Sequence, residues 1–135
     1  MPVLDLFTFY LQAACDFEHF TRALALGAEF GARFALVQGD DPDPVRLVDT
    51  FARFCDVAAP FGISAVIEFN PARPLATCKQ AVQLIERAGK ANAAICVDPL
   101  HLARSGGVPD DLRGIDPRLL PYAQFSDGRL HPVAR

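Results

Sequence analysis

Short apolar runs at a spacing of about 30 residues are the feature that most constrains how this chain folds. They begin at Arg33, Ile63 and Ala93, and a turn or a helical pattern follows each of them. The runs are continuously apolar rather than alternating, which is typical of parallel strands covered on both faces. One strand and one helix in each repeat predict an α/β fold with a parallel sheet.

The predicted elements alternate along the whole chain. Strands are predicted at 3–9, 33–38, 63–69, 93–97 and 122–126, and helices at 16–30, 45–59, 77–91 and 100–105. Asp16 is a good N-cap for the first helix, and Pro60 and Gly62 end the second. Residues 106–117 are predicted to form a long irregular loop. We expect one domain over residues 1–135, because the length suits no more than one.

Composition excludes several classes of protein. The net charge is −3 and no basic cluster marks a nucleic-acid surface. No apolar run approaches the roughly 20 residues of a membrane span, and the N-terminus lacks the basic segment of a signal peptide. The four cysteines form no C-x-x-C pair, which suits reduced, buried thiols. We therefore expect a cytoplasmic protein that binds neither nucleic acid nor membrane.

Polar side chains stand where the predicted strands end. Gln38, Glu68, Asp98 and the pair Gln124 and Asp127 all lie at or near C-terminal strand ends. In parallel α/β folds these ends share the face on which active sites are built. Polar groups on four successive strands favour the mouth of a barrel over the single crevice of an open sheet. Loop capping is the expected role of Gln38.

Two acidic residues end buried strands, one repeat apart. Glu68 ends one apolar run, and Asp98 ends the next and begins the sequence D-P-L-H, which closes with His101. A carboxylate at the end of a buried strand is costly unless it is paired, and a shared metal ion is one such pairing. Two alternatives stay open, namely a salt bridge from Glu68 to Arg73 or Arg33 and an N-cap role for Asp98.

From about Leu24 to Gly128 the chain resembles the xylose isomerase-like TIM barrel superfamily, the sugar phosphate isomerases and epimerases. The resemblance is carried by V-I-E-F at 66–69, V-D-P-L-H-L-A-R-S-G-G at 97–107 and Q-F-S-D at 124–127, with weaker support from G-A-R-F-A-L-V at 31–37. It implies a (β/α)8 barrel, which needs about 250 residues. We therefore expect an incomplete barrel domain of about five parallel strands with covering helices.

The resemblance also implies a metal site. In that family Glu, Asp, His and Glu side chains on successive late strands hold a divalent ion. Glu68 matches the first ligand and Asp98 the second, and Gln124 occupies the third slot, where some dehydroshikimate dehydratases of this fold also carry glutamine. Spacing alone favours Asp127 as the third ligand. The fourth ligand, a glutamate, is absent from this chain.

The implied activity is proton transfer next to a carbonyl. The resemblance makes Glu68 and His101 catalytic, and it makes His101 a contact of a small polyhydroxylated substrate. Arg104 lies three residues after His101, on the same face of the short predicted helix. We expect it to bind a carboxylate or phosphate of the substrate, and a solvated surface arginine is the alternative. Oxygen and nitrogen ligands suit Mn²⁺, Mg²⁺ or Co²⁺. The alternatives are a catalytically silent fragment or association subunit, and a dehydroshikimate dehydratase-like lyase. Apurinic endonuclease activity is disfavoured, because its trinuclear zinc site is rich in histidine and this chain has three histidines.

An incomplete barrel is expected to leave its inner face open. We predict that inner-face residues such as Leu36, Ile67 and Ile95 lie against water or small patches of loop. Exposed apolar areas of several hundred Å² are rare in soluble monomers, and free strand edges pair with other chains. The sequence therefore predicts a homo-oligomer, a dimer or a larger assembly, or aggregation, rather than a monomer.

Overall fold

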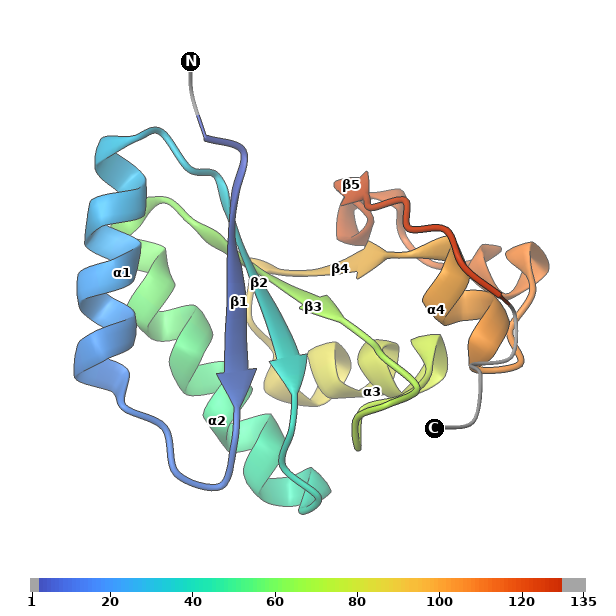
Figure 1. The fold of residues 1–135 in the computed structure, drawn as a ribbon. Helices are drawn as coiled ribbons and strands as arrows, with labels where there is room; N and C mark the ends of the chain where they lie inside the picture. The colour runs from blue at the N-terminus through green and yellow to red at the C-terminus, as the bar shows by residue number, and fades with distance from the viewer. Residues whose placement is uncertain (1–2, 130–135) are drawn as a thin grey trace.

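The computed structural model describes residues 3–129, which form one curved parallel sheet with helices packed against it (Figure 1). The five strands lie side by side in chain order, and each pairs in parallel with its neighbours. They are β1 (Asp5–Leu11), β2 (Phe34–Gly39), β3 (Ser64–Glu68), β4 (Ala93–Val97) and β5 (Tyr122–Ala123). The predicted α/β class and parallel sheet are therefore confirmed.

Four α-helices connect or follow the strands. They are α1 (Phe17–Glu29), α2 (Pro44–Ala58), α3 (Cys78–Ala88) and the short α4 (Pro99–Arg104). Three 3-10 turns complete the described chain, namely η1 (Ala59–Phe61), η2 (Pro109–Leu112) and η3 (Pro117–Leu119). The segment predicted as an irregular loop thus contains η2. None of the helices within residues 3–129 is long and apolar enough to cross a membrane.

Side-chain caps set where the helices begin. Asp16 accepts a hydrogen bond from the amide of His19, as its sequence position predicts, and Asp43 caps α2 in the same way. Thr77 and Gln80 form a reciprocal capping box at the start of α3. Each cap satisfies amides that the first helical turn leaves without intrahelical partners.

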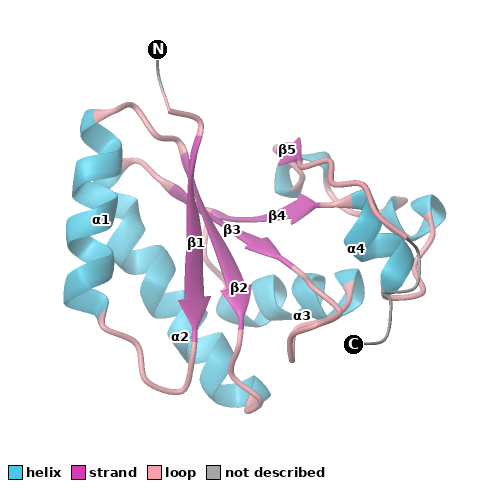
Figure 2. Ribbon diagram, viewed as in Figure 1, coloured by secondary structure: helices cyan, strands magenta, loops and turns pink. Residues whose placement is uncertain are grey.

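The helices α1, α2 and α3 pack on one face of the sheet and enclose the larger core (Figure 2). Ile67 and Ile95 belong to this core and are fully buried. The prediction that they line an open inner face is therefore wrong, because alternate residues of a strand point to opposite faces and these two point toward the helices.

A second, smaller core covers the opposite face of the sheet. Its buried members come from the middle strands, and Tyr122 packs against them; they are Phe34, Leu36, Val66, Ala94 and Cys96. Leu36 is only 1% exposed, so the expected exposure of this residue is also wrong. The curvature of the sheet brings the rings of Phe34 and Tyr122 to 5.0 Å, and these rings help to cover the inner face.

Exposed apolar side chains gather instead at the first strand. Phe7 and Tyr10 on β1 are 72% and 41% exposed, and Leu26 on α1 and Phe30 directly after it are also exposed. In the described sheet β1 pairs only with β2, so its other edge is free. The association of copies of this chain stays a prediction.

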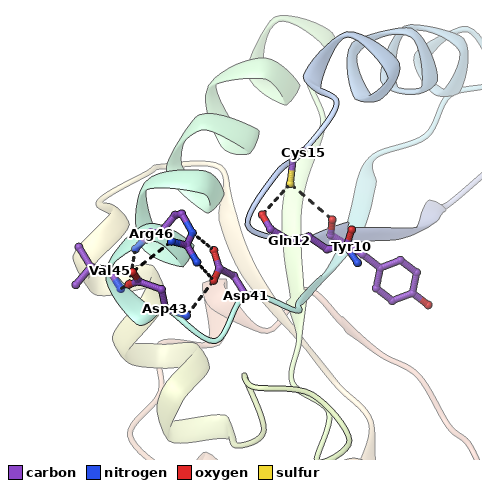
Figure 3. A network of polar contacts seen from close by, with 7 residues as sticks. All are labelled: Tyr10, Gln12, Cys15, Asp41, Asp43, Val45 and Arg46. Carbon is purple, nitrogen blue, oxygen red and sulfur yellow. Dashed lines mark hydrogen bonds and ion pairs between the residues drawn. The ribbon is translucent and has the colours of Figure 1, made fainter.

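The loop between β2 and α2 is held by a buried carboxylate (Figure 3). Asp41 is 1% exposed and accepts hydrogen bonds from Arg46 Nε at 2.6 Å and Nη2 at 2.7 Å, and from the amide of Asp43 at 2.9 Å. This differs from the solvated turn that the Asp-rich sequence suggests. The guanidinium of Arg46, by hydrogen bonding, lowers the pKa of Asp41 below its ordinary value of 3.8.

We predict that Arg46→Gln makes the protein more sensitive to acid. Because the pKa of Asp41 is lowered in the folded state, its stabilising effect is complete above pH 3.8 and is lost as pH falls through the folded pKa. The variant raises the folded pKa, so its acid unfolding, followed by circular dichroism, is expected to have a midpoint at higher pH.

Arg22→Gln is the matched control, since Arg22 pairs with Glu18 on the exposed face of α1. It is expected to leave the acid midpoint unchanged. Equal midpoints for the Arg46 variant and the wild type would contradict the assigned role of Asp41.

Candidate metal centre

Three predicted site residues meet at the C-terminal edge of the sheet. Glu68 is the last residue of β3, Asp98 follows β4 directly, and His101 lies in α4, into which β4 runs (Figure 2). One ligand atom from each of these residues lies within 4.8 Å of the other two. The parallel pairing of β3 with β4 produces this convergence, because it places both strand ends at one edge.

Glu68 is buried and held by a neighbouring strand. It is 5% exposed, and Gln38 Nε2 on β2 donates a hydrogen bond to its Oε2. Its other oxygen, Oε1, lies 4.0 Å from His101 Nε2. The predicted loop-capping role of Gln38 is therefore wrong, because the side chain of Gln38 is buried and contacts Glu68 across the sheet.

Neither arginine proposed as a partner of Glu68 pairs with it in the described chain. Arg73 forms an ion pair with Asp40, with Nη1 and Oδ1 separated by 3.0 Å. The guanidinium of Arg33 lies over the ring of Phe34 at 5.4 Å. The negative charge of Glu68 thus has no arginine to compensate it within residues 3–129.

Asp98 caps α4 and also belongs to the three-residue cluster. Its Oδ1 accepts hydrogen bonds from the amides of Leu100 at 2.8 Å and His101 at 3.4 Å, and so caps α4. Its Oδ2 accepts a hydrogen bond from Ser126 Oγ at 2.5 Å. The carboxylate is 3% exposed and also belongs to the three-residue cluster. An N-cap role therefore does not exclude Asp98 as a ligand.

His101 has an unpartnered ring nitrogen. Its side chain is 18% exposed, and its Nδ1 is buried without a hydrogen-bond partner among residues 3–129. A buried polar atom without a partner carries a desolvation cost, and such atoms in native structures call for an explanation. The nitrogen recorded near the carboxylates is Nε2, 4.0 Å from Glu68 Oε1, and a ring nitrogen with two buried carboxylates fits the oxygen and nitrogen donor set of a divalent cation.

Gln124 lies beside the first strand. Its Nε2 donates a hydrogen bond to Asp5 Oδ2 at 3.3 Å, and Tyr122 Oη donates to the same oxygen at 2.9 Å. Asp127, the alternative ligand, is exposed and its Oδ1 accepts a hydrogen bond from the amide of Gly128. The role of Gln124 as a metal ligand stays a prediction.

Arg104 contacts the chain itself. Its Nε and Nη2 donate hydrogen bonds to the carbonyl oxygen of Arg129 at 3.1 and 2.6 Å. It lies on α4 three residues after His101, which is one helical turn. The contact ties α4 to the segment that follows β5. Contact of Arg104 with a substrate stays a prediction.

Three contacts of predicted site residues were not predicted from sequence: that of Asp5 with Gln124, that of Gln38 with Glu68, and that of Ser126 with Asp98. Each contact spans at least 28 residues of sequence. Of Asp5, Gln38 and Ser126, only Gln38 is one of the polar residues at predicted strand ends that indicated a place near the site. Asp5 interrupts an apolar run, a weak sign that its side chain has a partner elsewhere in the fold.

Cys96 lies next to the cluster, in register with Glu68 on the neighbouring strand. Burial, together with the nearby charge of Glu68, raises the pKa of this thiol to about 12. Burial and the hydrogen bond to Asp5 likewise raise the pKa of Tyr122. Both side chains are therefore neutral at physiological pH, and Tyr122 remains a hydrogen-bond donor.

A comparison with protein-family models matches residues 12–134 to the xylose isomerase-like TIM barrel. The chain belongs to this family. The match covers most of the described sheet and all three residues of the cluster. It confirms the family predicted from the sequence motifs. No curated protein matches this chain.

Solved structures agree with the family assignment. The chain superposes on the IolI protein with a bound zinc atom (TM-score 0.77, 17% identity, 92% of this chain and 51% of that one). It superposes on the probable 3-DHS dehydratase AsbF from Bacillus anthracis (TM-score 0.76, 18% identity, 90% of this chain and 49% of that one). It also superposes on the apo form of the 3-keto-D-glucoside 4-epimerase YcjR from E. coli (TM-score 0.79, 15% identity, 94% of this chain and 59% of that one).

These likenesses, all below 25% identity, establish the fold. The chain spans about half the length of the three structures, so its five strands correspond to part of a barrel. The prediction of a partial TIM barrel with about five parallel strands is confirmed.

We predict that Cys96 and Cys55 resist thiol reagents in the folded protein. Burial raises both pKa values to about 12. Since the thiolate is the reactive form, only about one thiol in ten thousand is reactive at pH 8. Ellman's reagent is expected to modify the partly exposed Cys15 first and all four cysteines in denaturant. Cys15→Ser, as control, removes the first phase, and rapid labelling of Cys96 would contradict the buried site.

Proposed function

We propose that this chain carries the metal-binding edge of an isomerase or epimerase that transfers a proton next to the carbonyl of a small polyhydroxylated substrate. The observation that supports this most is the convergence of Glu68, Asp98 and His101 within 4.8 Å at the C-terminal edge of the sheet. Active sites of TIM barrels lie on that face. The 3-keto-D-glucoside 4-epimerase YcjR shares the fold, and this likeness supports the proposed activity.

The donor set supports a divalent cation. Glu68 and Asp98 offer carboxylate oxygens, His101 offers an imidazole nitrogen, and Gln124 is the proposed further ligand. Such ligands suit Mn²⁺, Mg²⁺ or Co²⁺. A bound ion would supply a Lewis acid that stabilises negative charge on the oxygen of the substrate carbonyl. The zinc in the IolI structure supports metal use without deciding which ion this chain prefers.

Glu68 is the proposed base. Its Oε2 is engaged by Gln38, which leaves Oε1, on the side of His101, to accept a proton from the carbon next to the carbonyl. The electron pair of the broken C–H bond then forms the double bond of an enediolate. Return of the proton to the former carbonyl carbon, together with transfer of the hydroxyl proton from the oxygen that becomes the new carbonyl to the other enediolate oxygen, completes an isomerisation. Epimerisation instead requires a donor that returns a proton to the original carbon from the opposite face. Arg104 is proposed to bind the substrate oxygens, while His101, which the sequence predicts as a substrate contact, is proposed as a ligand of the ion instead.

A dehydroshikimate dehydratase-like lyase is the second candidate. Gln124 favours it, since the sequence resemblance places glutamine at this slot in some dehydratases. The Bacillus anthracis structure shows that a protein named as a probable dehydratase shares the fold. The same base then removes the proton from the carbon next to the carbonyl, the electron pair of that bond forms a carbon–carbon double bond, and the base returns the proton to the hydroxyl group, which leaves the adjacent carbon as water.

We predict that the chain binds Mn²⁺ weakly and that Asp98→Asn reduces the affinity by about tenfold or more. Asparagine retains the N-cap of α4 but lacks the negative charge, so the variant separates charge from folding. Calorimetric titration at neutral pH measures both affinities. Asp110→Asn is the control, because Asp110 is exposed and pairs with Arg113 away from the cluster. Absence of binding at millimolar Mn²⁺ would instead support a catalytically silent chain.

We predict that the Mn²⁺-loaded protein exchanges the proton next to the carbonyl of a ketose with solvent. Proton NMR in D₂O with a panel of ketoses and hydroxy-keto acids measures the loss of that signal. Glu68→Gln is expected to abolish exchange, because the amide cannot accept the proton, while the Asp110→Asn control exchanges normally. Formation of a dehydrated product without prior exchange would favour the lyase.

A further inference from the structure

We propose that Asp5 is a positioning residue that holds the amide of Gln124 so that its carbonyl oxygen faces the cluster of Glu68, Asp98 and His101. This inference rests on the metal-binding part of the proposed function. It assigns a task to the first strand, which contributes none of the three residues of the cluster. It also identifies the atom of Gln124 that is available to a cation.

One carboxylate oxygen joins the first and last described strands. Asp5 Oδ2 accepts hydrogen bonds from Tyr122 Oη at 2.9 Å and Gln124 Nε2 at 3.3 Å. The residues paired in this way are 117 and 119 positions apart in sequence. Because β5 pairs with β4 over only two residues, these side-chain bonds are a substantial part of what holds it.

Alternation along the chain places Gln124 between Asp5 and Asp98. Side chains two residues apart in an extended segment point to the same face. Tyr122 reaches Asp5, and Ser126 reaches Asp98 Oδ2 at 2.5 Å. Gln124 stands between these two residues in sequence, so alternation puts its side chain on the same side of the segment as those of Tyr122 and Ser126.

The carboxylate decides which way the amide of Gln124 is turned. An ionised carboxylate only accepts hydrogen bonds, so the NH₂ group must face Asp5 and the carbonyl oxygen must point away from it. Within residues 3–129 no hydrogen bond to Gln124 Oε1 is found, whereas the backbone amide of Gln124 donates to the carbonyl of Val97. The oxygen is therefore the atom left for a ligand.

Tyr122 reinforces the arrangement. Its ring lies 5.0 Å from that of Phe34, and its hydroxyl donates to the same oxygen as Gln124. The phenol thereby fixes Asp5 from a second direction without contacting the cluster. Tyr122→Phe removes the hydrogen bond from the phenol to Asp5 and leaves the one from Gln124. The variant therefore tests the contribution of Tyr122 to the stability of β5 without changing the orientation of the Gln124 amide.

A double-mutant cycle with Mn²⁺ tests the inference. Asp5→Ala is expected to weaken Mn²⁺ binding by about tenfold, the range seen when a residue that orients a ligand is removed. Asp5→Asn keeps an acceptor oxygen for both donors and is expected to bind Mn²⁺ nearly as the wild type does. In a Gln124→Ala background Asp5→Ala is expected to have no further effect, because the group it positions is gone.

Two measurements separate positioning from folding. Thermal unfolding of each variant, with Tyr122→Phe as the control, shows whether the sheet persists. The ¹⁵N–¹H signals of the Gln124 side-chain amide, recorded without metal, are expected to shift in Asp5→Ala and to stay near their wild-type positions in Asp5→Asn. A merely structural role of Asp5 predicts instead equal losses of Mn²⁺ affinity with and without Gln124.

The outcomes distinguish this inference from the proposed function. Failure of the wild-type chain to bind Mn²⁺ overturns both. Wild-type binding with unchanged affinity in Asp5→Ala, or with additive losses in the cycle, overturns only the role of Asp5.

Discussion

The burial of two carboxylates at neighbouring strand ends is the constraint on which the architecture of the site depends. Glu68 and Asp98 are each at most 5% exposed, and the parallel pairing of β3 with β4 brings them to one edge. Gln38 donates one hydrogen bond to Glu68, while Asp98 receives bonds from two backbone amides and from Ser126. These bonds offset desolvation but not the repulsion of like charges, which is why a cation is the natural complement of the pair.

Curvature gives this short sheet a second core. A flat sheet of five strands with helices on one face leaves its other face in water. Here Phe34 and Tyr122 approach each other across the inner face, and the small side chains of Ala94 and Cys96 leave room for them. The buried inner cluster explains how part of a barrel covers its interior, while Phe7 and Tyr10 on β1 remain exposed.

The two faces have different tasks. The larger core between the helices and the sheet contains most of the buried apolar side chains, including Phe51 and Phe54. The inner face has a small apolar layer around Val66, and the acidic cluster lies at the C-terminal edge beyond it. Stability and the candidate chemistry thus depend largely on different residues, as is usual when a site is built at the strand ends of an α/β fold.

The sequence by itself determined the order of strands and helices, the parallel sheet and the convergence of Glu68 with Asp98, because hydrophobic period, caps and strand ends are local signals. Only the tertiary structure decided which face each strand residue occupies, the partner of Gln38 and the contact of Asp5 with Gln124. Those contacts join residues 30 and 119 positions apart. They depend on strand register and on the curvature of the whole sheet, which no local pattern encodes.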